Sequence, residues 1–182
     1  MSVRNPRLRR KPTIHRGERG SSLIEMMIGA VVLLLGIVPL MGVFGMAVAQ
    51  NGSYVEMATR TGFYAQDKME QLMALNFADA TADTTVYPTA LVGGNGLGGT
   101  MAGNSTVGSV NPAAPVAGYV DYLTFQGALQ TAAGGARYRR QWSVSTDATG
   151  NLKTITVLVT MVSYAGPGLA PSTTLVCMKS NS

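Results

Sequence analysis

The sequence is poor in the side chains that carry most enzyme chemistry. It has one cysteine and one histidine in 182 residues, which excludes an internal disulfide framework and a cysteine-rich zinc site and leaves little basis for histidine catalysis. No Ser/His/Asp set, metal-ligand cluster or paired acids stand out, so we expect no enzyme activity, no metal and no cofactor. Only 13% of the residues are charged while 46% are hydrophobic, a composition too apolar for a disordered chain.

The positive charge of the chain is confined to its beginning. The formal net charge is +5, but residues 1–20 hold seven basic residues and one acid, a net +6. The remaining residues hold seven basic residues and eight acids, a net −1. Two interpretations follow: a basic arm that binds nucleic acid, or a cytoplasmic anchor that obeys the positive-inside rule.

A long uncharged segment decides between them. Residues 26–49, MMIGAVVLLLGIVPLMGVFGMAVA, contain no charge over 24 positions. A helix of that length spans a hydrocarbon core of roughly 30 Å. With the basic leader kept inside, the sequence predicts a single pass of the inner membrane with a cytoplasmic N-terminus and everything after Ala49 outside.

One carboxylate stands at the edge of this apolar segment. Glu25 ends the stretch Arg19-Gly20-Ser21-Ser22-Leu23-Ile24-Glu25, and an ionised Glu there is costly unless it lies at the interface or has a partner. The alternative is that Glu25 is an acid at the membrane interface that has no specific function.

This stretch resembles the class III signal of type IV pilins and pseudopilins. The resemblance implies that an aspartic prepilin peptidase cleaves between Gly20 and Ser21 and methylates the new amino group of Ser21. It implies that Glu25 then pairs with the N-terminal amine of a neighbouring subunit during assembly. The family usually has Phe or Met where this chain has Ser21.

Two other export signals compete with this interpretation. Ala47-Val48-Ala49 is an A-x-A pattern that signal peptidase would cut to leave Gln50 first, but the apolar segment is longer than a signal-peptide core. Arg9-Arg10 fits a twin-arginine signal, but Lys11-Pro12-Thr13 lacks the apolar residues expected after it.

Helix-weakening residues recur within the apolar segment. Gly36, Pro39, Gly42 and Gly45 are spaced by three, and a proline removes one helical hydrogen bond. We expect a kink or a locally unwound stretch between Gly36 and Gly45, with a tolerated membrane-helix proline as the alternative. Because pilin helices have a flexible stretch near a proline in this region, the resemblance favours a mechanical role.

The helix is predicted to continue outside the membrane to about Asn76. Glu56 and Arg60 are spaced for an i,i+4 ion pair. An apolar seam at helical spacing needs a globular cover; it comprises Val55, Ala58, Gly62, Ala65, Met69 and Leu72. The segment Thr59–Phe77, with its AQDKMEQL stretch, resembles the end of the long helix in PilV-type minor pilins.

Residues 78–118 read as a long irregular connection with some short pieces of structure. Eight glycines lie between Gly93 and Gly118, and the only charges are Asp79 and Asp83. Residues 94–99, GNGLGG, match G-x-G-x-x-G formally, but no βαβ unit surrounds them.

Strand patterns dominate the last third of the chain. We predict strands at residues 119–125, 137–145, 152–164 and 173–178, joined in an antiparallel meander with one face on the helix seam. Two sets of alternating residues each share one face of a strand: Tyr138, Arg140, Trp142 and Val144, then Ile155, Val157, Val159 and Met161. The RQWSV…LKTITVLV pattern also resembles PilV-type minor pilins.

Two features of these strands were weighed separately. Cys177 is predicted to be a small buried hydrophobe without a disulfide partner. Arg137, Arg139 and Arg140 make either a polyanion-binding patch for DNA or, in our preferred interpretation, a solvated edge, because the chain after the leader is slightly acidic.

The sequence therefore predicts an α+β protein, a long N-terminal helix packed on a small antiparallel sheet, as in pilins. Its expected parts are a cleaved leader (1–20), an apolar assembly helix (21–49), an exposed helix (50–77), a Gly-rich connection (78–118) and a sheet (119–182). The resemblance is closest over residues 16–50, extends with fewer matching residues to 51–77 and 137–178, and does not cover 78–118.

The resemblance implies a minor type IV pilin that is incorporated into, or primes, a pilus. The expected partners are prepilin peptidase, other pilins, the pilus assembly platform and, before assembly, the inner membrane; the final location would be the pilus, periplasm or cell surface. The alternatives are a pseudopilin of type II secretion and a DNA-uptake or adhesive subunit, with DNA the weaker partner.

Overall fold

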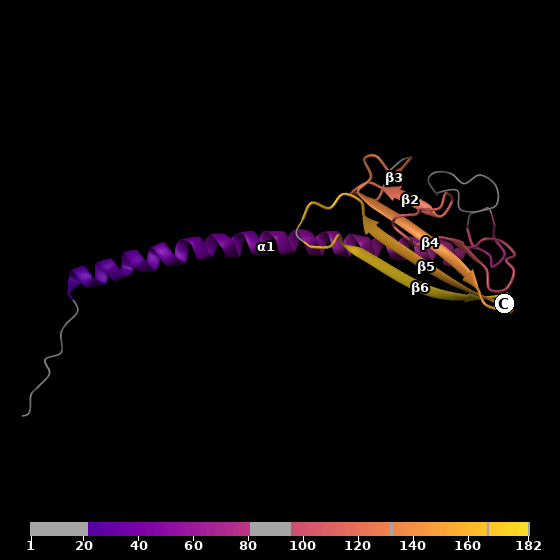
Figure 1. The fold of residues 1–182 in the computed structure, drawn as a ribbon, viewed down its shortest axis with the longest axis horizontal. Helices are drawn as coiled ribbons and strands as arrows, with labels where there is room; N and C mark the ends of the chain where they lie inside the picture. Colours follow the sequence, from indigo (N-terminus) through magenta and orange to yellow (C-terminus); the bar gives the residue numbers. More distant parts are fainter. Residues whose placement is uncertain (1–21, 81–95, 132, 167, 182) are drawn as a thin grey trace, which may run out of the picture. The chain divides into compact units, whose positions relative to one another are not determined.

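One helix and six strands make up the regular structure of the described residues. The computed structural model describes residues 22–80, 96–131, 133–166 and 168–181. The chain divides into two compact units, Met1–Met46 and Ala47–Ser182. The helix, α1 (Leu23–Ala74), is 52 residues long and contributes to both units (Figure 1).

The backbone of α1 is helical from end to end. Its first bonds run from the amides of Glu25 and Met26 to the carbonyl of Ser22. The unwound stretch expected between Gly36 and Gly45 is absent, because these residues are helical together with Pro39. One proline costs one intrahelical bond, and intact turns on both sides preserve the helix. The helix ends at Ala74, two residues before the predicted Asn76.

The sheet is antiparallel throughout, as predicted. Its order is β3-β2-β4-β5-β6, with β1 also paired to β4. The strands are β1 (Thr106–Gly108), β2 (Val120–Leu123), β3 (Leu129–Gln130), β4 (Tyr138–Thr146), β5 (Leu152–Met161) and β6 (Ser172–Ser180). The four predicted strands correspond to β2, β4, β5 and β6, and the meander β4-β5-β6 is confirmed.

The sheet begins earlier in the chain than predicted. β1 lies inside the range 78–118 and pairs Val107 with Val144 of β4. Gly108 ends β1 at a φ of 74°, and a Cβ there would come 2.3 Å from the carbonyl oxygen of Trp142. Only glycine permits that backbone approach in the left-handed region, so β1 depends on a close contact that no strand propensity reveals.

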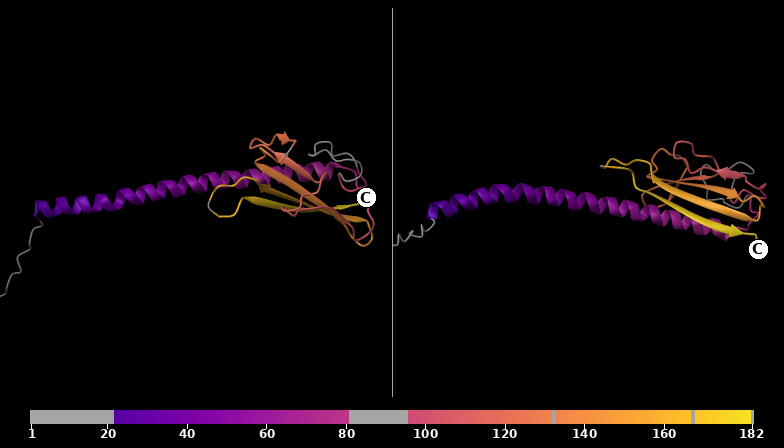
Figure 2. Two further views of the ribbon diagram at one scale, coloured as in Figure 1. Left: turned by 45° about the horizontal axis from the view of Figure 1, so that its top comes forward. Right: turned by 60° about the horizontal axis from the view of Figure 1, so that its bottom comes forward.

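The core lies between the sheet and the second part of α1, within the unit Ala47–Ser182. Figure 2 shows this part of the helix along one face of the sheet. The residues predicted to share one face of β4 and one face of β5 lie toward the core, since all eight are buried. Trp142 and Tyr138 are the two largest fully buried side chains, and they make edge-to-face contacts with Tyr119 and Tyr64 respectively.

The buried stripe of α1 differs from the predicted apolar seam. The buried helix residues are Thr61, Tyr64, Ala65, Lys68 and Leu72, so only Ala65 and Leu72 of the seam are buried. Val55 is 54% exposed. The helix is turned so that a lysine and a threonine face the core, which the sheet allows because it supplies polar partners for both.

Candidate functional site

The first part of α1 is an unburied apolar surface. Every side chain from residue 22 to residue 56 is exposed in this chain. The large ones are mostly more than half exposed, for example Leu35 at 72% and Phe44 at 70%. The helix is long and apolar enough to cross a membrane. A helix that is hydrophobic on every face is stable only inside a membrane or among other chains, so this surface requires a partner.

Glu25 lies in the first turn of this helix. The sequence-predicted cleavage residues Gly20 and Ser21 lie outside the described residues. Among the described residues Glu25 forms no ion pair. The order Ser22-Leu23-Ile24-Glu25 also fits a helix capping box, in which the glutamate would serve its own chain. An ion pair with a neighbouring subunit needs the negative charge of Glu25. A capping box does not, because a glutamine can replace the glutamate there.

The glycines of the apolar segment are not required by packing within the chain. A Cβ at Gly36, Gly42 or Gly45 would meet nothing within 4 Å. All three have ordinary helical backbone. Their predicted contribution to flexibility remains a prediction.

The predicted basic patch on β4 is wrong for Arg140. Arg140 is 3% exposed and faces the core, so it does not lie on the surface with Arg137. Its Nη2 lies 2.6 Å from Asp121 Oδ2, and its Nη1 lies 2.7 Å from Asp67 Oδ2. The guanidinium thus joins β4 to β2 and to α1. A buried arginine with two carboxylate partners has no free charge to offer a polyanion.

Lys68 completes a buried charged cluster that the sequence did not reveal. Its Nζ lies 3.3 Å from Asp121 Oδ2 and 4.0 Å from the ring centroid of Trp142. Lys68 and Asp121 are both fully buried. Removing one partner from such a pair leaves an uncompensated charge and costs roughly 3–5 kcal/mol. The cluster therefore fixes how α1 lies on the sheet.

Two lysines from the sheet bind backbone carbonyls, Lys179 in the last turn of α1 and Lys153 in segments that follow the helix. Lys153 of β5 is fully buried, and its Nζ donates to the carbonyls of Phe77, Leu97 and Gly99 at 2.5–2.8 Å. Burial lowers the pKa of Lys153. Lys179 of β6 donates to the carbonyl of Met73 at 2.7 Å. The last turn of α1 contains no basic residue, although positive charge stabilises a helix C-terminus. This absence was the one sequence signal that a lysine from another element binds there.

The glycine-rich segment serves structure rather than phosphate binding. Gly94 and Asn95 of the formal motif lie outside the described residues. The amides of Leu97 and Gly99 both donate to the carbonyl of Asp79, and Leu97 is buried. These amides are therefore already bonded within the chain and do not form a phosphate cradle.

Cys177 is only partly buried, contrary to prediction. It lies on β6 with intermediate exposure and is a free thiol. β6 is an edge strand paired only with β5, so its inward side chains are covered incompletely.

The functional surface thus consists of an unpartnered apolar helix with one acid at its start, next to a unit that is held together by its own core. Comparisons of the chain with protein-family models, curated proteins and solved structures found no match.

Proposed function

We propose that the chain is a minor type IV pilin of the PilV type, made as a membrane-bound prepilin and incorporated into, or priming, a pilus after cleavage between Gly20 and Ser21. One observation carries the proposal: Glu25 lies in the first turn of a helix whose next 24 residues are uncharged and unburied by the chain itself. The basic leader precedes this turn directly.

The physical argument starts from the cost of the carboxylate. A charge at the end of an apolar helix is tolerated in a filament only if an opposite charge meets it. Cleavage after Gly20 would create an amino group four residues from Glu25, one in each subunit. Packing of apolar helices then supplies cohesion, since each fully buried aliphatic side chain contributes about 1.5–3 kcal/mol. The ion pair would set the register of one subunit against the next.

The first test is the mass of the mature N-terminus. We expect a chain that begins at Ser21, with or without one added methyl group. A chain that begins at Gln50, or one that keeps residues 1–20, would contradict the proposal.

The second test removes the charge of Glu25 and retains its capping ability. We expect Glu25→Gln and Glu25→Leu to abolish incorporation into sheared filaments, measured by immunoblot, while membrane levels of the protein stay normal. If Glu25→Gln is incorporated normally and only Glu25→Leu fails, the residue acts as a helix cap and the assembly role is wrong.

A pseudopilin of type II secretion is the second candidate, because the same leader, acid and apolar helix would serve it. Deletion of the gene separates the two. Loss of surface pili supports the minor pilin, whereas loss of exoprotein release with normal pili supports the pseudopilin. A DNA-binding role is weakened by the burial of Arg140.

A further inference from the structure

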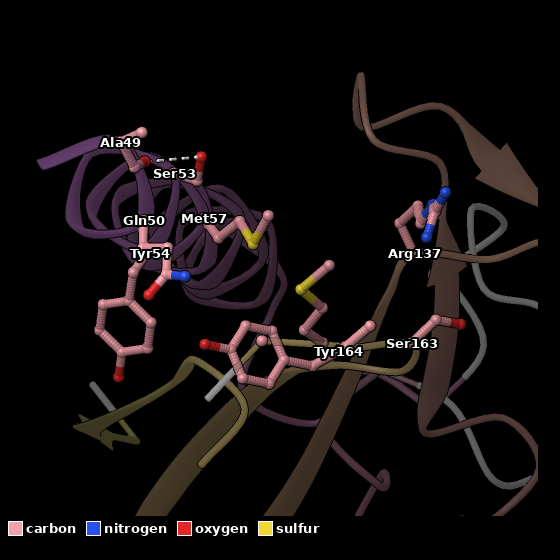
Figure 3. A pocket seen from close by; sticks show the side chains of 11 residues that line it. Ala49, Gln50, Ser53, Tyr54, Met57, Arg137, Ser163 and Tyr164 are labelled. Carbon is pink, nitrogen blue, oxygen red and sulfur yellow. Dashed lines mark hydrogen bonds between the residues drawn. The ribbon is translucent and has the colours of Figure 1, made fainter. Parts of the chain in front are cut away.

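A hollow lies beside α1 immediately after the apolar segment. It has a volume of about 400 Å³ and lies wholly within the unit Ala47–Ser182. One wall is α1 from Ala49 to Met57, and the other is the end of β5 with the loop that follows it. Tyr54 and Tyr164 both line it and contact each other edge to face, with ring centroids 6.3 Å apart at 71° (Figure 3). Arg137 lies at its border.

The distance from the apolar segment places this hollow at a defined depth. Tyr54 is five residues beyond Ala49, or roughly 7.5 Å along the helix axis. The headgroup layer on each side of a bilayer is roughly 5–8 Å thick, the difference between the total thickness and the hydrocarbon core. When residues 26–49 span the membrane, the two tyrosines therefore lie at the level of the headgroups, where Tyr and Trp are enriched.

The loop that joins β5 to β6, residues 162–171, contains no charged residue. Its residues 163–166 line the hollow together with α1. Leu169 is 88% exposed and Val162 is 39% exposed. The turn at the opposite end of the strands, residues 147–151, reads Asp-Ala-Thr-Gly-Asn and is polar. The two ends of the sheet thus differ, and the apolar end is the one that meets α1 at Ala49, the last residue of the uncharged segment.

The charge at the hollow matches a phospholipid. Arg137 is exposed, and its guanidinium forms no ion pair with any described residue. Glu56, the residue before Met57 on α1, forms an ion pair with Arg60 at 2.9 Å. A guanidinium that lies beside apolar and aromatic walls is suited to a phosphate that carries acyl chains.

We propose that, before assembly, this end of the sheet rests on the outer surface of the membrane and binds a phospholipid. Arg137 binds the headgroup phosphate, the hollow beside Tyr54 and Tyr164 holds the glycerol region, and Leu169 and Val162 enter the acyl boundary. These contacts hold the sheet against the bilayer until α1 leaves the membrane. The inference rests on the membrane-spanning state within the proposed function and not on filament formation.

The test uses the full chain in vesicles of phosphatidylethanolamine and phosphatidylglycerol that contain acyl-brominated lipid. In a Cys177→Ala background, a bimane label is placed at Ala170→Cys in the apolar loop or, as the matched control, at Thr149→Cys in the polar turn. Both positions are exposed. We expect severalfold stronger quenching by brominated lipid at position 170 than at position 149.

Two further substitutions, in the chain labelled at position 170, test the contacts. We expect Arg137→Gln and Leu169→Gln each to lower the quenching toward the level at position 149. Both side chains are exposed, so the fold is retained, and the fluorescence of Trp142 in the core verifies this.

Equal quenching at positions 170 and 149 overturns the proposal. A signal at position 170 that depends on protein density and not on brominated lipid also overturns it, because a second copy of the chain would then cover the surface. The outcome is independent of the Glu25 experiment. Filaments can form normally while position 170 stays in water, and a failure of Glu25 variants to show an assembly defect leaves the quenching result interpretable.

Discussion

The two parts of α1 find their hydrophobic partners in different places. From residue 26 to residue 49 the helix is uncharged and exposed on every face. From residue 57 onward it carries charges at Arg60, Asp67, Lys68 and Glu70, yet one stripe is buried against the sheet. The more apolar part is thus the unburied one. Hydrophobicity alone therefore does not tell which part of a helix packs within its own chain.

The two parts of α1 differ in whether the chain itself supplies a surface that packs against them. The buried stripe is matched by a sheet that offers Trp142 to Leu72 and its apolar neighbours and Asp121 to Lys68. The apolar segment has no such counterpart among the described residues. Its burial must come from lipid or from other subunits, in agreement with the proposed role in assembly.

Among the variants that test this difference between the two parts of α1, we expect the largest loss of stability from a change in the buried cluster of Asp121, Arg140 and Lys68. Asp121→Asn leaves Arg140 and Lys68 without their shared carboxylate, and we expect the free energy of unfolding to fall by roughly 3–5 kcal/mol. Urea denaturation of the full chain in detergent micelles, followed by the fluorescence of Trp142, measures the change. Trp142 is the only tryptophan and lies against Lys68.

Asp67→Asn is the matched control. The Asp67 side chain is 47% exposed and accepts hydrogen bonds from Arg140 Nη1 at 2.7 Å and from Gln71 Nε2 at 3.0 Å. A partly exposed pair contributes at most about 1 kcal/mol, so the loss should be much smaller than for Asp121→Asn. Equal losses for the two variants would show that the cluster is not the clamp between α1 and the sheet.

A matched leucine pair compares the two parts of the helix directly. Leu72 is fully buried, whereas Leu40 is 60% exposed. We expect Leu72→Ala to lower the free energy of unfolding by roughly 2–5 kcal/mol and Leu40→Ala to change it by less than about 0.5 kcal/mol. The same urea titration measures both. A loss of similar size for Leu40→Ala would mean that the apolar segment packs within its own chain after all.

The smallest expected effect is a dependence of stability on alkaline pH. Burial raises the pKa of Tyr119 to about 12 from the ordinary 10. Between these values the folded state keeps a proton that the unfolded state loses, so stability present below pH 10 falls as pH rises, by at most about 1.4 kcal/mol per pH unit.

Lys153 acts in the opposite direction over a lower range. Its pKa is lowered by burial, so the unfolded state binds more protons between the lowered value and 10.5, and stability rises with pH there. Urea titrations from pH 8 to 11.5 should therefore show a loss of stability above pH 10 that Tyr119→Phe reduces, while Tyr138, whose pKa burial also raises, accounts for a remaining part. An unchanged alkaline loss in Tyr119→Phe would assign it to another group.

Periodicity predicted the elements well where one face is uniformly apolar. The alternation of Ile155, Val157 and Val159 predicted both the strand and its buried face. The helix was predicted to within two residues of its C-terminal end. The predicted i,i+4 pair of Glu56 and Arg60 is present at 2.9 Å. These features depend on neighbours in sequence, which a pattern can represent.

The pattern failed where polar residues face the core. The seam through Val55 and Ala58 was preferred to the stripe through Thr61 and Lys68 because threonine and lysine count as surface residues. Both interpretations of Arg137, Arg139 and Arg140, a polyanion patch and a solvated edge, likewise assumed that Arg140 is exposed. Their partners Thr173 and Asp121 are distant in sequence. No pattern of neighbouring residues therefore predicts that these polar groups have partners in the core.

The sequence by itself determined the basic leader, the uncharged segment with Glu25 at its start, and the succession of one helix and an antiparallel sheet, because these follow from charge placement and periodicity along the chain. Only the tertiary structure decided which face of α1 the sheet covers, that Arg140 and Lys68 share Asp121, and that residues 163–166 line a hollow with α1. These depend on contacts between residues tens of positions apart, where a buried charge is tolerated because the fold brings a partner of opposite charge to it.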